Sequence, residues 1–378
     1  MYISEEQLKG FDSYKYSCVD TSPLANYVMH PFWNQFVKVF PKWLAPNVMT
    51  ILGFLLLVVQ MFVFIWYDPV FAAAPDKFLI PHWVWYFSVV AQFFSHTLDG
   101  CDGKQARRTG SSSPLGELFD HGLDSWSVSL FVFNAYSAFG RHAYPVDKMY
   151  GVYASTMLGF MISHWEKYNT GILFLPWSYD LSQMALLFVY LIISIFGLEV
   201  MQSNIFGMSI AFWFGTLVYV STFFLTLPQS LYNVFIAYHN GTAKQSSLYE
   251  AFIPLFSPFA GFLLFALWVY ISPGDILQTN PRLVYFALSV LFSNILCRLI
   301  VAQMSGTRCQ VLNLFIPIST VCLLLVVTTG SPEVESYILW GLTLVMTVAH
   351  IHYGMVVVDK LADHFGIAVF HIRKKTID

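Results

Sequence analysis

Charged residues are scarce in this chain, since Asp, Glu, Lys and Arg together make up only 11% of its 378 residues. Apolar residues make up 57%, aromatic residues make up 18%, and the mean hydropathy is +0.60. This composition excludes an ordinary soluble globular domain. Long apolar stretches recur from about residue 48 onward, and they predict an all-α, polytopic membrane protein.

Cysteine is also sparse, and the five cysteines show no paired spacing. A disulfide scaffold and a cysteine-based zinc site are therefore not expected. The first 47 residues are too polar to contain the apolar core of a signal peptide, so the first span is expected to serve as the targeting signal. The formal net charge of −3 says little about partners, and no nucleic-acid partner is expected.

The chain divides into three predicted parts. Residues 1–46 form a cytosolic segment in which bulky apolar residues recur at helical spacing over 27–44, as expected for an amphipathic helix in the membrane interface. Residues 47–357 form a single transmembrane domain, and 358–378 form a basic cytosolic tail. About ten spans are predicted, centred on the windows 48–67, 81–101, 117–139, 146–165, 181–197, 207–227, 250–271, 283–303, 311–328 and 336–357. We expect kinks or breaks at Pro228, Pro254, Pro258 and Pro317.

The positive charges favour one orientation of these spans. If the N-terminus is cytosolic, fourteen Lys and Arg residues fall in cytosolic segments and four fall on the opposite side. Because cytosolic loops are enriched in positive charge, both termini are predicted to be cytosolic. The sequon Asn240-Gly241-Thr242 then lies on the cytosolic side and is expected to stay unmodified.

Acidic residues are concentrated in one stretch, residues 99–124. Asp99 and Asp102 are three residues apart, and Glu117, Asp120, His121 and Asp124 recur at steps of three and four, so each set shares one helix face. Charges in a membrane protein are costly, and a bound divalent cation offsets that cost. Carboxylates without paired Cys or His suit Mg²⁺ or Mn²⁺, and four aspartates from two helices can hold two ions that act on a phosphoryl group.

Small and basic residues accompany these acids. Gly103 follows Asp102 and Gly116 precedes Asp120, and without side chains they let a phosphate approach closely. Arg107, with Lys104 beside it, would meet the phosphate charge from the cytosolic rim, although Lys104 is equally explained as an ordinary interfacial cation.

The stretch fits the pattern D-x2-D-G-x2-A-R-x8-G-x3-D-x3-D at every fixed position, from Asp99 to Asp124. This pattern resembles the motif of the CDP-alcohol phosphotransferases. Residues 40–53 and 98–126 resemble the eukaryotic choline/ethanolamine branch, and the span layout resembles that branch over nearly the whole chain. Residues 163–171 resemble its ethanolamine-specific members, because choline and dual-specificity enzymes carry uncharged residues where Glu166 and Lys167 stand.

The resemblance implies that the chain transfers phosphoethanolamine from CDP-ethanolamine to diacylglycerol, yielding phosphatidylethanolamine and CMP. It also implies a homodimer in the endoplasmic reticulum or Golgi membrane, with the mouth of the site facing the cytosol. Two alternatives stay open. One is a choline-preferring or dual enzyme with the same chemistry, and the other is a cation-coupled transporter whose acids bind the transported ion.

Several roles follow from the resemblance together with the spacing. Asp99, Asp102 and Asp120 are expected metal ligands, and Asp124 is either the fourth ligand or the base. His121 is the expected general base, with Glu117 one turn away to orient it, unless both only hydrogen-bond at a helix contact. Two further assignments have open alternatives: Asn47 and Thr50 contact cytidine or mark a helix start, and Glu166 binds the head group or pairs with Lys167.

Overall fold

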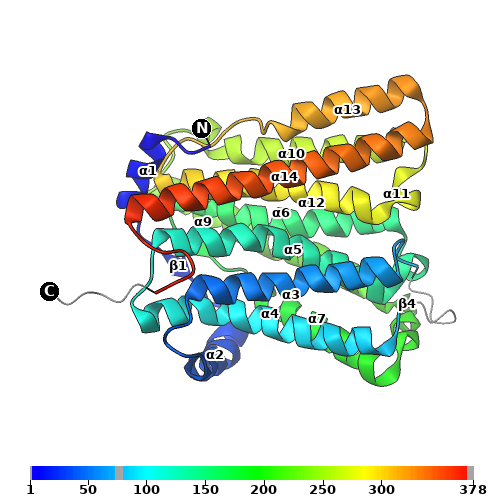
Figure 1. Ribbon diagram of the computed structural model, residues 1–378, viewed down its shortest axis with the longest axis horizontal. Helices are drawn as coiled ribbons and strands as arrows, with labels where there is room; N and C mark the ends of the chain where they lie inside the picture. Colours follow the sequence, from blue (N-terminus) through cyan, green and yellow to red (C-terminus); the bar gives the residue numbers. More distant parts are fainter. Residues whose placement is uncertain (1, 73–79, 373–378) are drawn as a thin grey trace.

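The computed structural model describes residues 2–72 and 80–372 (Figure 1). In this part of the chain the structure is helical apart from two short strand pairs, parallel β1–β2 and antiparallel β3–β4. The basic residues 373–375 of the predicted tail lie outside the described residues. The elements are α1 (Glu5–Asp12), β1 (Cys18–Val19), η1 (Ala25–Met29), α2 (His30–Phe36), η2 (Val37–Val39), α3 (Pro46–Tyr67), α4 (His82–Thr109), α5 (Pro114–Ala143), α6 (Val146–Thr170), β2 (Leu173–Phe174), α7 (Ser178–Phe196), η4 (Leu198–Gln202), β3 (Asn204–Ile205), β4 (Met208–Ser209), α8 (Ile210–Val220), η5 (Ser221–Thr226), α9 (Leu227–His239), α10 (Leu248–Ile271), α11 (Ile276–Thr279), α12 (Pro281–Ser305), α13 (Phe315–Thr329) and α14 (Pro332–Phe365).

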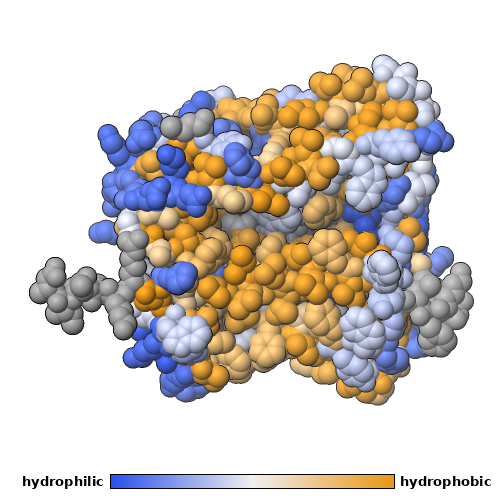
Figure 2. Space-filling view, viewed as in Figure 1, coloured by the Kyte–Doolittle hydropathy of each residue, from blue (hydrophilic) through white to orange (hydrophobic). Residues whose placement is uncertain are grey.

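The long helices lie side by side in one bundle (Figure 1), and an apolar belt covers its middle while hydrophilic residues gather toward its ends (Figure 2). Within the described residues, six helical segments are long and apolar enough to cross a membrane. These are α3, α7, the continuous run α8–η5–α9, α10, α12 and α14, and α13 is a shorter apolar helix. The chain is therefore a multi-pass membrane protein, as predicted.

Each of the ten predicted windows overlaps a helix of the bundle. Among these helices, α4, α5 and α6 have 28, 30 and 25 residues and carry the charged groups of the predicted site. Helix α10 continues through Pro254 and Pro258, so of the kinks or breaks expected there a break does not occur. Trp165 Nε1 of α6 donates to the Ala251 carbonyl in the first turn of α10, 2.7 Å away, and ties the two helices together.

Close packing of α3 and α4 against each other positions the predicted acidic stretch. A Cβ atom at Gly53 in α3 would lie only 3.2 Å from the Ser95 carbonyl of α4, so a side chain at position 53 would push the two helices apart. Helix α5 packs on α3, and α12 lies on the other side of α5 with 89% of its span buried. The acidic ends of α4 and α5 are thus held between apolar helices.

The amphipathic segment near the N-terminus was predicted to lie in the membrane interface, but one of its faces packs against α4. Helical structure covers 25–39 as η1, α2 and η2, whereas 40–45 are not helical. Trp33 is 4% exposed and its ring fills the space above Gly100, where a Cβ atom would overlap the indole. Trp43 is 77% exposed and Tyr27 is 83% exposed. One face of this segment therefore anchors α4, and only the other face is free to contact a membrane.

Candidate active site

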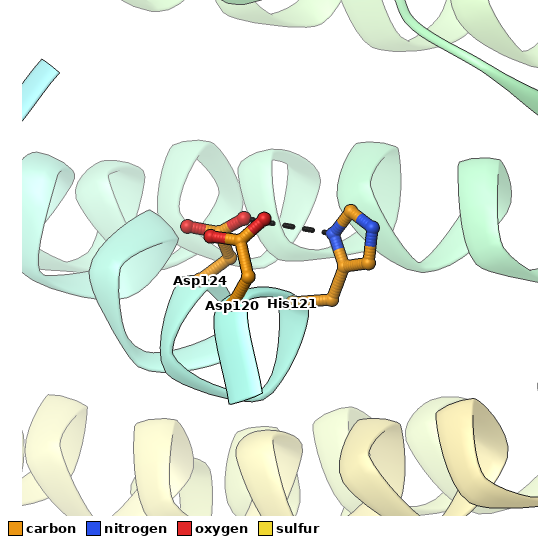
Figure 3. A group of neighbouring side chains, drawn as sticks. All are labelled: Asp120, His121 and Asp124. Atoms are coloured by element: carbon orange, nitrogen blue, oxygen red, sulfur yellow. Dashed lines mark ion pairs between the residues drawn. The ribbon is translucent and has the colours of Figure 1, made fainter. Parts of the chain in front are cut away.

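Carboxylates from α4 and α5 converge as their spacing predicted. Oxygens of Asp99, Asp102 and Asp120 lie within 4.8 Å of one another, and the same holds for ligand atoms of Asp120, His121 and Asp124. Figure 3 shows the carboxylates of Asp120 and Asp124 side by side with the His121 ring next to them. Both groups share Asp120, so the described residues offer two adjoining sets of donors for a metal ion.

Hydrogen bonds from neighbouring helices reach some of the carboxylate oxygens in the cluster, but not all of them. The Thr50 hydroxyl of α3 donates to Asp102 Oδ2 at 2.6 Å, and the Tyr179 hydroxyl of α7 donates to Asp99 Oδ2 at 2.6 Å. Asp120 Oδ1 is buried and has no hydrogen-bond partner among the residues that the structure describes. Because buried carboxylates repel one another and a buried acceptor without a partner is costly, this donor set fits a hard divalent cation.

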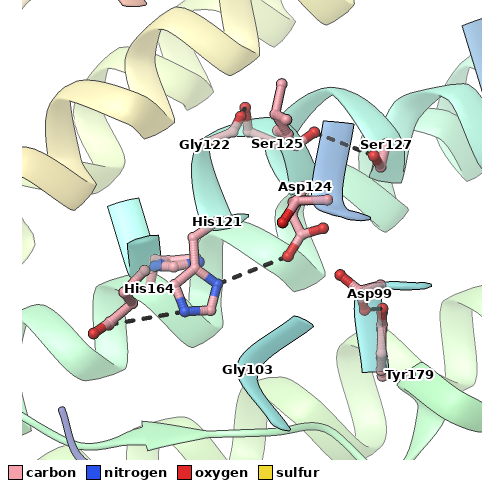
Figure 4. Close-up of polar contacts among 12 residues, drawn as sticks. Asp99, Gly103, His121, Gly122, Asp124, Ser125, Ser127, His164 and Tyr179 are labelled. Carbon is pink, nitrogen blue, oxygen red and sulfur yellow. Dashed lines mark hydrogen bonds and ion pairs between the residues drawn. The ribbon is translucent and has the colours of Figure 1, made fainter. Parts of the chain in front are cut away.

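A small cavity of about 20 Å³ opens beside the acids, between α3, α4, α5 and α7. Asp99, Asp124 and Tyr179 form its polar side (Figure 4), and Phe54 and Phe131 form its apolar side. A cavity with one polar and one apolar side suits an amphiphilic molecule whose reactive group must reach the acids.

His121 lies between two carboxylates on its own helix. Its Nδ1 is 3.7 Å from Asp124 Oδ2, and its Nε2 is 3.8 Å from Glu117 Oε1. Both distances exceed the range of a hydrogen bond, so the ring is flanked by these acids without being bonded to either. The His121 side chain is almost fully buried and its ring packs edge-on against His164 of α6 (Figure 4).

Glu117 has closer partners than His121. Its Oε1 accepts from Lys167 Nζ of α6 and from the Tyr14 hydroxyl, each at 2.5 Å. Burial, with Glu117 beside it, raises the pKa of Tyr14 above its ordinary value, so this hydroxyl keeps its proton and donates. The predicted Glu117–His121 pair is therefore part of a larger group that includes the N-terminal segment.

The expected nucleotide-binding residues lie beside the acidic cluster, around the start of α3, the end of α4 and the start of α5. A Cβ atom at Gly116 would lie 3.6 Å from Asn47 Oδ1, and a Cβ atom at Gly103 would lie 3.6 Å from the Arg107 guanidinium. A Cβ atom would make only ordinary contacts at either position, so the idea that these glycines let a phosphate approach closely stays a prediction.

Two of these polar groups contact other parts of the chain. Asn47 Nδ2 donates to the Val369 carbonyl at 2.9 Å, which brings the segment after α14 against the start of α3. Lys104 Nζ donates to Asn34 Oδ1 at 2.9 Å and the residue is only partly buried, which agrees with the alternative of an interfacial cation.

The sequence left open the alternative that Glu166 forms an ion pair with Lys167. This alternative is wrong, because Lys167 forms its ion pair with Glu117. Glu166 instead faces α9, where it accepts from Ser230 Oγ and from Asn233 Nδ2 at 2.6 Å. Neighbouring positions on a helix point in different directions, and this separates the two side chains. Glu166 is 1% exposed, so an ammonium could reach it only if these contacts separated.

Several residues of the site were not identified from the sequence. Tyr179 and Asp180 enter from the first turn of α7, and Asp180 lies 2.9 Å from His96 Nε2 of α4. Tyr14 and Lys167 enter from the N-terminal segment and α6. Tyr14, Tyr179 and Asp180 belong to no spaced motif, and their only signal is a polar group next to or inside an apolar run. The sequence singles out Lys167 within residues 163–171 and as an alternative partner of Glu166, but it does not predict the contact with Glu117.

Comparison with known proteins agrees with this arrangement. The sequence pattern of the family described as CDP-alcohol phosphatidyltransferase matches residues 43–269. The chain is 50% identical to Ethanolaminephosphotransferase 1 of Homo sapiens over 383 residues, covering 100% of this chain and 96% of that protein. It is 48% identical to the Mus musculus protein of the same name over 382 residues, with the same coverage. It is 32% identical to Choline/ethanolaminephosphotransferase 1 of Arabidopsis thaliana over 396 residues, covering 99% of each chain.

Proposed function

The chain belongs to the CDP-alcohol phosphatidyltransferase family, and we propose that it transfers phosphoethanolamine from CDP-ethanolamine to diacylglycerol. The products are phosphatidylethanolamine and CMP. The observation that carries this proposal is the convergence of four aspartates from α4 and α5 beside a cavity with polar and apolar sides, in a chain similar along its whole length to an ethanolaminephosphotransferase. A soluble nucleotide and a lipid can meet at such a site.

The test is an assay of the purified protein with diacylglycerol, Mg²⁺ or Mn²⁺, and either CDP-ethanolamine or CDP-choline. Phosphatidylethanolamine formation with a clear preference for CDP-ethanolamine is expected. Equal or better use of CDP-choline would favour the dual or choline-preferring alternative. The Arabidopsis relative is named as an enzyme for both head groups. Absence of turnover with both donors would contradict the proposal.

Asp99, Asp102, Asp120 and Asp124 would hold the metal ions, and the unpartnered Asp120 Oδ1 is the atom that most needs one. We propose two Mg²⁺ or Mn²⁺ ions in each site. When bound, such ions neutralise phosphate oxygens and stabilise the charge that develops during in-line phosphoryl transfer.

The protein groups supply positioning and proton transfer. His121 accepts the proton of the diacylglycerol hydroxyl on an imidazole nitrogen as the hydroxyl oxygen bonds to the phosphorus that carries ethanolamine, and the bond from that phosphorus to CMP breaks. Asp124 and Glu117 flank the two ring nitrogens at 3.7 and 3.8 Å and limit how the ring can turn. Asp124 is the alternative base.

Residues at the rim of the site would bind the nucleotide. Asn47 and Thr50 lie at the start of α3, where they can contact cytidine or its ribose, and Arg107 of α4 can contact phosphate. Lys104 adds positive charge, while Gly103 and Gly116 leave space for the diphosphate. Glu166 is retained as a candidate contact for the ethanolamine ammonium.

The membrane arrangement completes the proposal. Residues 47–357 form a single catalytic domain of ten spans, and the exposed face of residues 27–44 lies in the interface. The termini, the start of α5 and the acidic site are all assigned to the cytosolic side of the endoplasmic reticulum or Golgi membrane. Asn240 should then carry no glycan, and a glycosylated Asn240 would contradict this orientation. Cross-linking in the membrane tests the proposed homodimer.

A further inference from the structure

The ammonium group of Lys167 lies in a cage of aromatic rings and a carboxylate. Its Nζ is 5.5 Å from the centre of the Tyr14 ring, 5.4 Å from the centre of the Tyr16 ring and 2.5 Å from Glu117 Oε1. Lys167 is 3% exposed, so these contacts replace most of its water. Aromatic faces with a nearby carboxylate are the usual surroundings of a bound ammonium ligand.

The cage is fixed in place by three separate parts of the chain. Tyr14 and Tyr16 belong to the N-terminal segment, Glu117 to α5 and Lys167 to α6. Immediately after Tyr16, strand β1 pairs with β2, which joins Cys18 to Leu173 just beyond the end of α6. The Tyr14 hydroxyl also donates to Glu117 Oε1. The tyrosines are therefore held against the helices.

The cage adjoins the reaction site. Glu117 is one turn before His121 on α5, and its Oε1 lies 3.8 Å from His121 Nε2. His121 in turn belongs to the group with Asp120 and Asp124, whose ligand atoms lie within 4.8 Å of one another. The cage thus lies where the ammonium of a CDP-alcohol is expected.

Primary and quaternary ammonium groups need different partners. A primary ammonium donates N–H bonds, whereas a quaternary ammonium has none and binds through aromatic faces. Among the described residues, the contacts of Glu117 all use Oε1, so Oε2 is available to accept from a second ammonium. The ring faces of Tyr14 and Tyr16 that point into the cage, in contrast, are already occupied by Lys167, although Tyr16 is 54% exposed on its outer side.

We propose that Tyr14, Tyr16 and Glu117 form a cation cage that Lys167 fills, and that the filled cage selects a donor with a primary ammonium over one with a quaternary ammonium. The inference rests on the proposed function and adds to it the means of head-group selection. A primary ammonium binds at the free oxygen of Glu117. A trimethylammonium group has no N–H to donate to that oxygen, and inside the cage Lys167 already lies over both rings.

The test compares kcat/KM for CDP-choline with kcat/KM for CDP-ethanolamine in variants of the full chain. Lys167→Ala empties the cage, so the choline-to-ethanolamine ratio should rise at least about tenfold. Lys167→Met keeps most of the bulk without the charge and should raise the ratio by less. Because Met also preserves the packing, it is the variant that reports if Lys167→Ala does not fold. Lys148→Ala removes an exposed lysine elsewhere and should leave the ratio unchanged.

A second substitution shows whether the aromatic faces are responsible. Tyr16→Leu, added to either Lys167 variant, should reverse the gain with CDP-choline while phosphatidylethanolamine is still formed. If the wild type is active and neither Lys167 variant changes the ratio, the cage inference is wrong and the proposed function stands. A ratio that responds to Glu166→Gln instead would assign selection to Glu166. Inactivity of the wild type toward both donors would overturn the proposed function and the inference that depends on it.

Discussion

Two of the regions of this bundle that hold buried carboxylates have very different surroundings. Glu335, near the start of α14, is 0% exposed and accepts three hydrogen bonds, from Trp268 Nε1 at 3.0 Å, Ser272 Oγ at 2.8 Å and the Gly274 amide at 2.9 Å. These donors tie α14 to the end of α10 and the turn before α11, at the end of the bundle opposite α1 and β1 (Figure 1). This acid is supported entirely by protein groups.

The aspartates of α4 and α5 have the opposite arrangement. They lie next to other carboxylates, and Asp120 Oδ1 is buried without a partner. A structural acid is stable in a low-dielectric interior because the fold supplies its donors, whereas the functional acids require a cation from outside. Substitutions of the α4 and α5 aspartates should therefore reduce activity, whereas substitution of Glu335 should reduce stability.

Asp120→Asn should have the largest effect on turnover. Asp120 belongs to both donor sets, so its loss should lower phosphatidylethanolamine formation by at least about a thousandfold. The same change removes one of several clustered negative charges, so the melting temperature of the purified protein should stay constant or rise. Metal removal with a chelator should abolish activity in the wild type, and added Mg²⁺ or Mn²⁺ should restore it. A large fall in melting temperature would show that Asp120 is a structural acid like Glu335.

His121→Ala should lower turnover by about a hundredfold or more, because the diacylglycerol hydroxyl loses its proton acceptor. CDP-ethanolamine binding should change little, since no proton moves in that step. Steady-state turnover and equilibrium nucleotide binding measure the two effects separately. Turnover within a few-fold of the wild type would transfer the role of base to Asp124.

Tyr179→Phe should have an intermediate effect that appears in the metal requirement. The hydroxyl that it removes donates to Asp99 Oδ2 and helps to orient that carboxylate. The metal concentration for half-maximal activity should rise by about tenfold, with little change in rate at saturating metal. Tyr270→Phe, at a tyrosine that is 87% exposed, is the matched control. An unchanged metal titration would show that Tyr179 does not support a metal ligand.

Glu335→Gln should have the smallest effect on turnover and a clear effect on stability. The neutral amide keeps the shape but weakens the charge-assisted hydrogen bonds, which should cost about 2 kcal/mol of unfolding free energy. Specific activity per folded molecule should match the wild type. Glu333→Gln, two residues earlier and exposed, should change neither quantity. Loss of activity in the folded Glu335→Gln variant would show that Glu335 is not a purely structural acid.

The features predicted well from the sequence are local ones. Apolar runs located the long helices, and the spacing of Asp99, Asp102, Asp120 and Asp124 placed each pair on one helix face, because helical periodicity is a property of a short stretch. At Pro254 and Pro258, where the sequence predicted kinks or breaks, the helix is not broken, because packing against neighbouring helices can hold a helix together across a proline and is not visible in the sequence of α10 itself.

The features that were missed depend on contacts between distant segments. Nothing in the spacing around Tyr179 indicates that its hydroxyl reaches Asp99, which lies 80 positions earlier. Likewise, Glu117 was expected to serve His121 four residues away, and its closest partners come instead from Tyr14 and Lys167. The Trp33 ring contacts Gly100 because two helices cross there, and only the fold reveals that crossing.

The bond between Asn47 and the Val369 carbonyl has a consequence for biosynthesis. Asn47 is at the start of the first long helix and is made early, but its partner follows the last helix of the bundle. This contact can form only after residue 369 has emerged from the ribosome. A nascent chain that already holds its aspartates in the membrane therefore still lacks this contact of Asn47, which belongs to the proposed nucleotide rim.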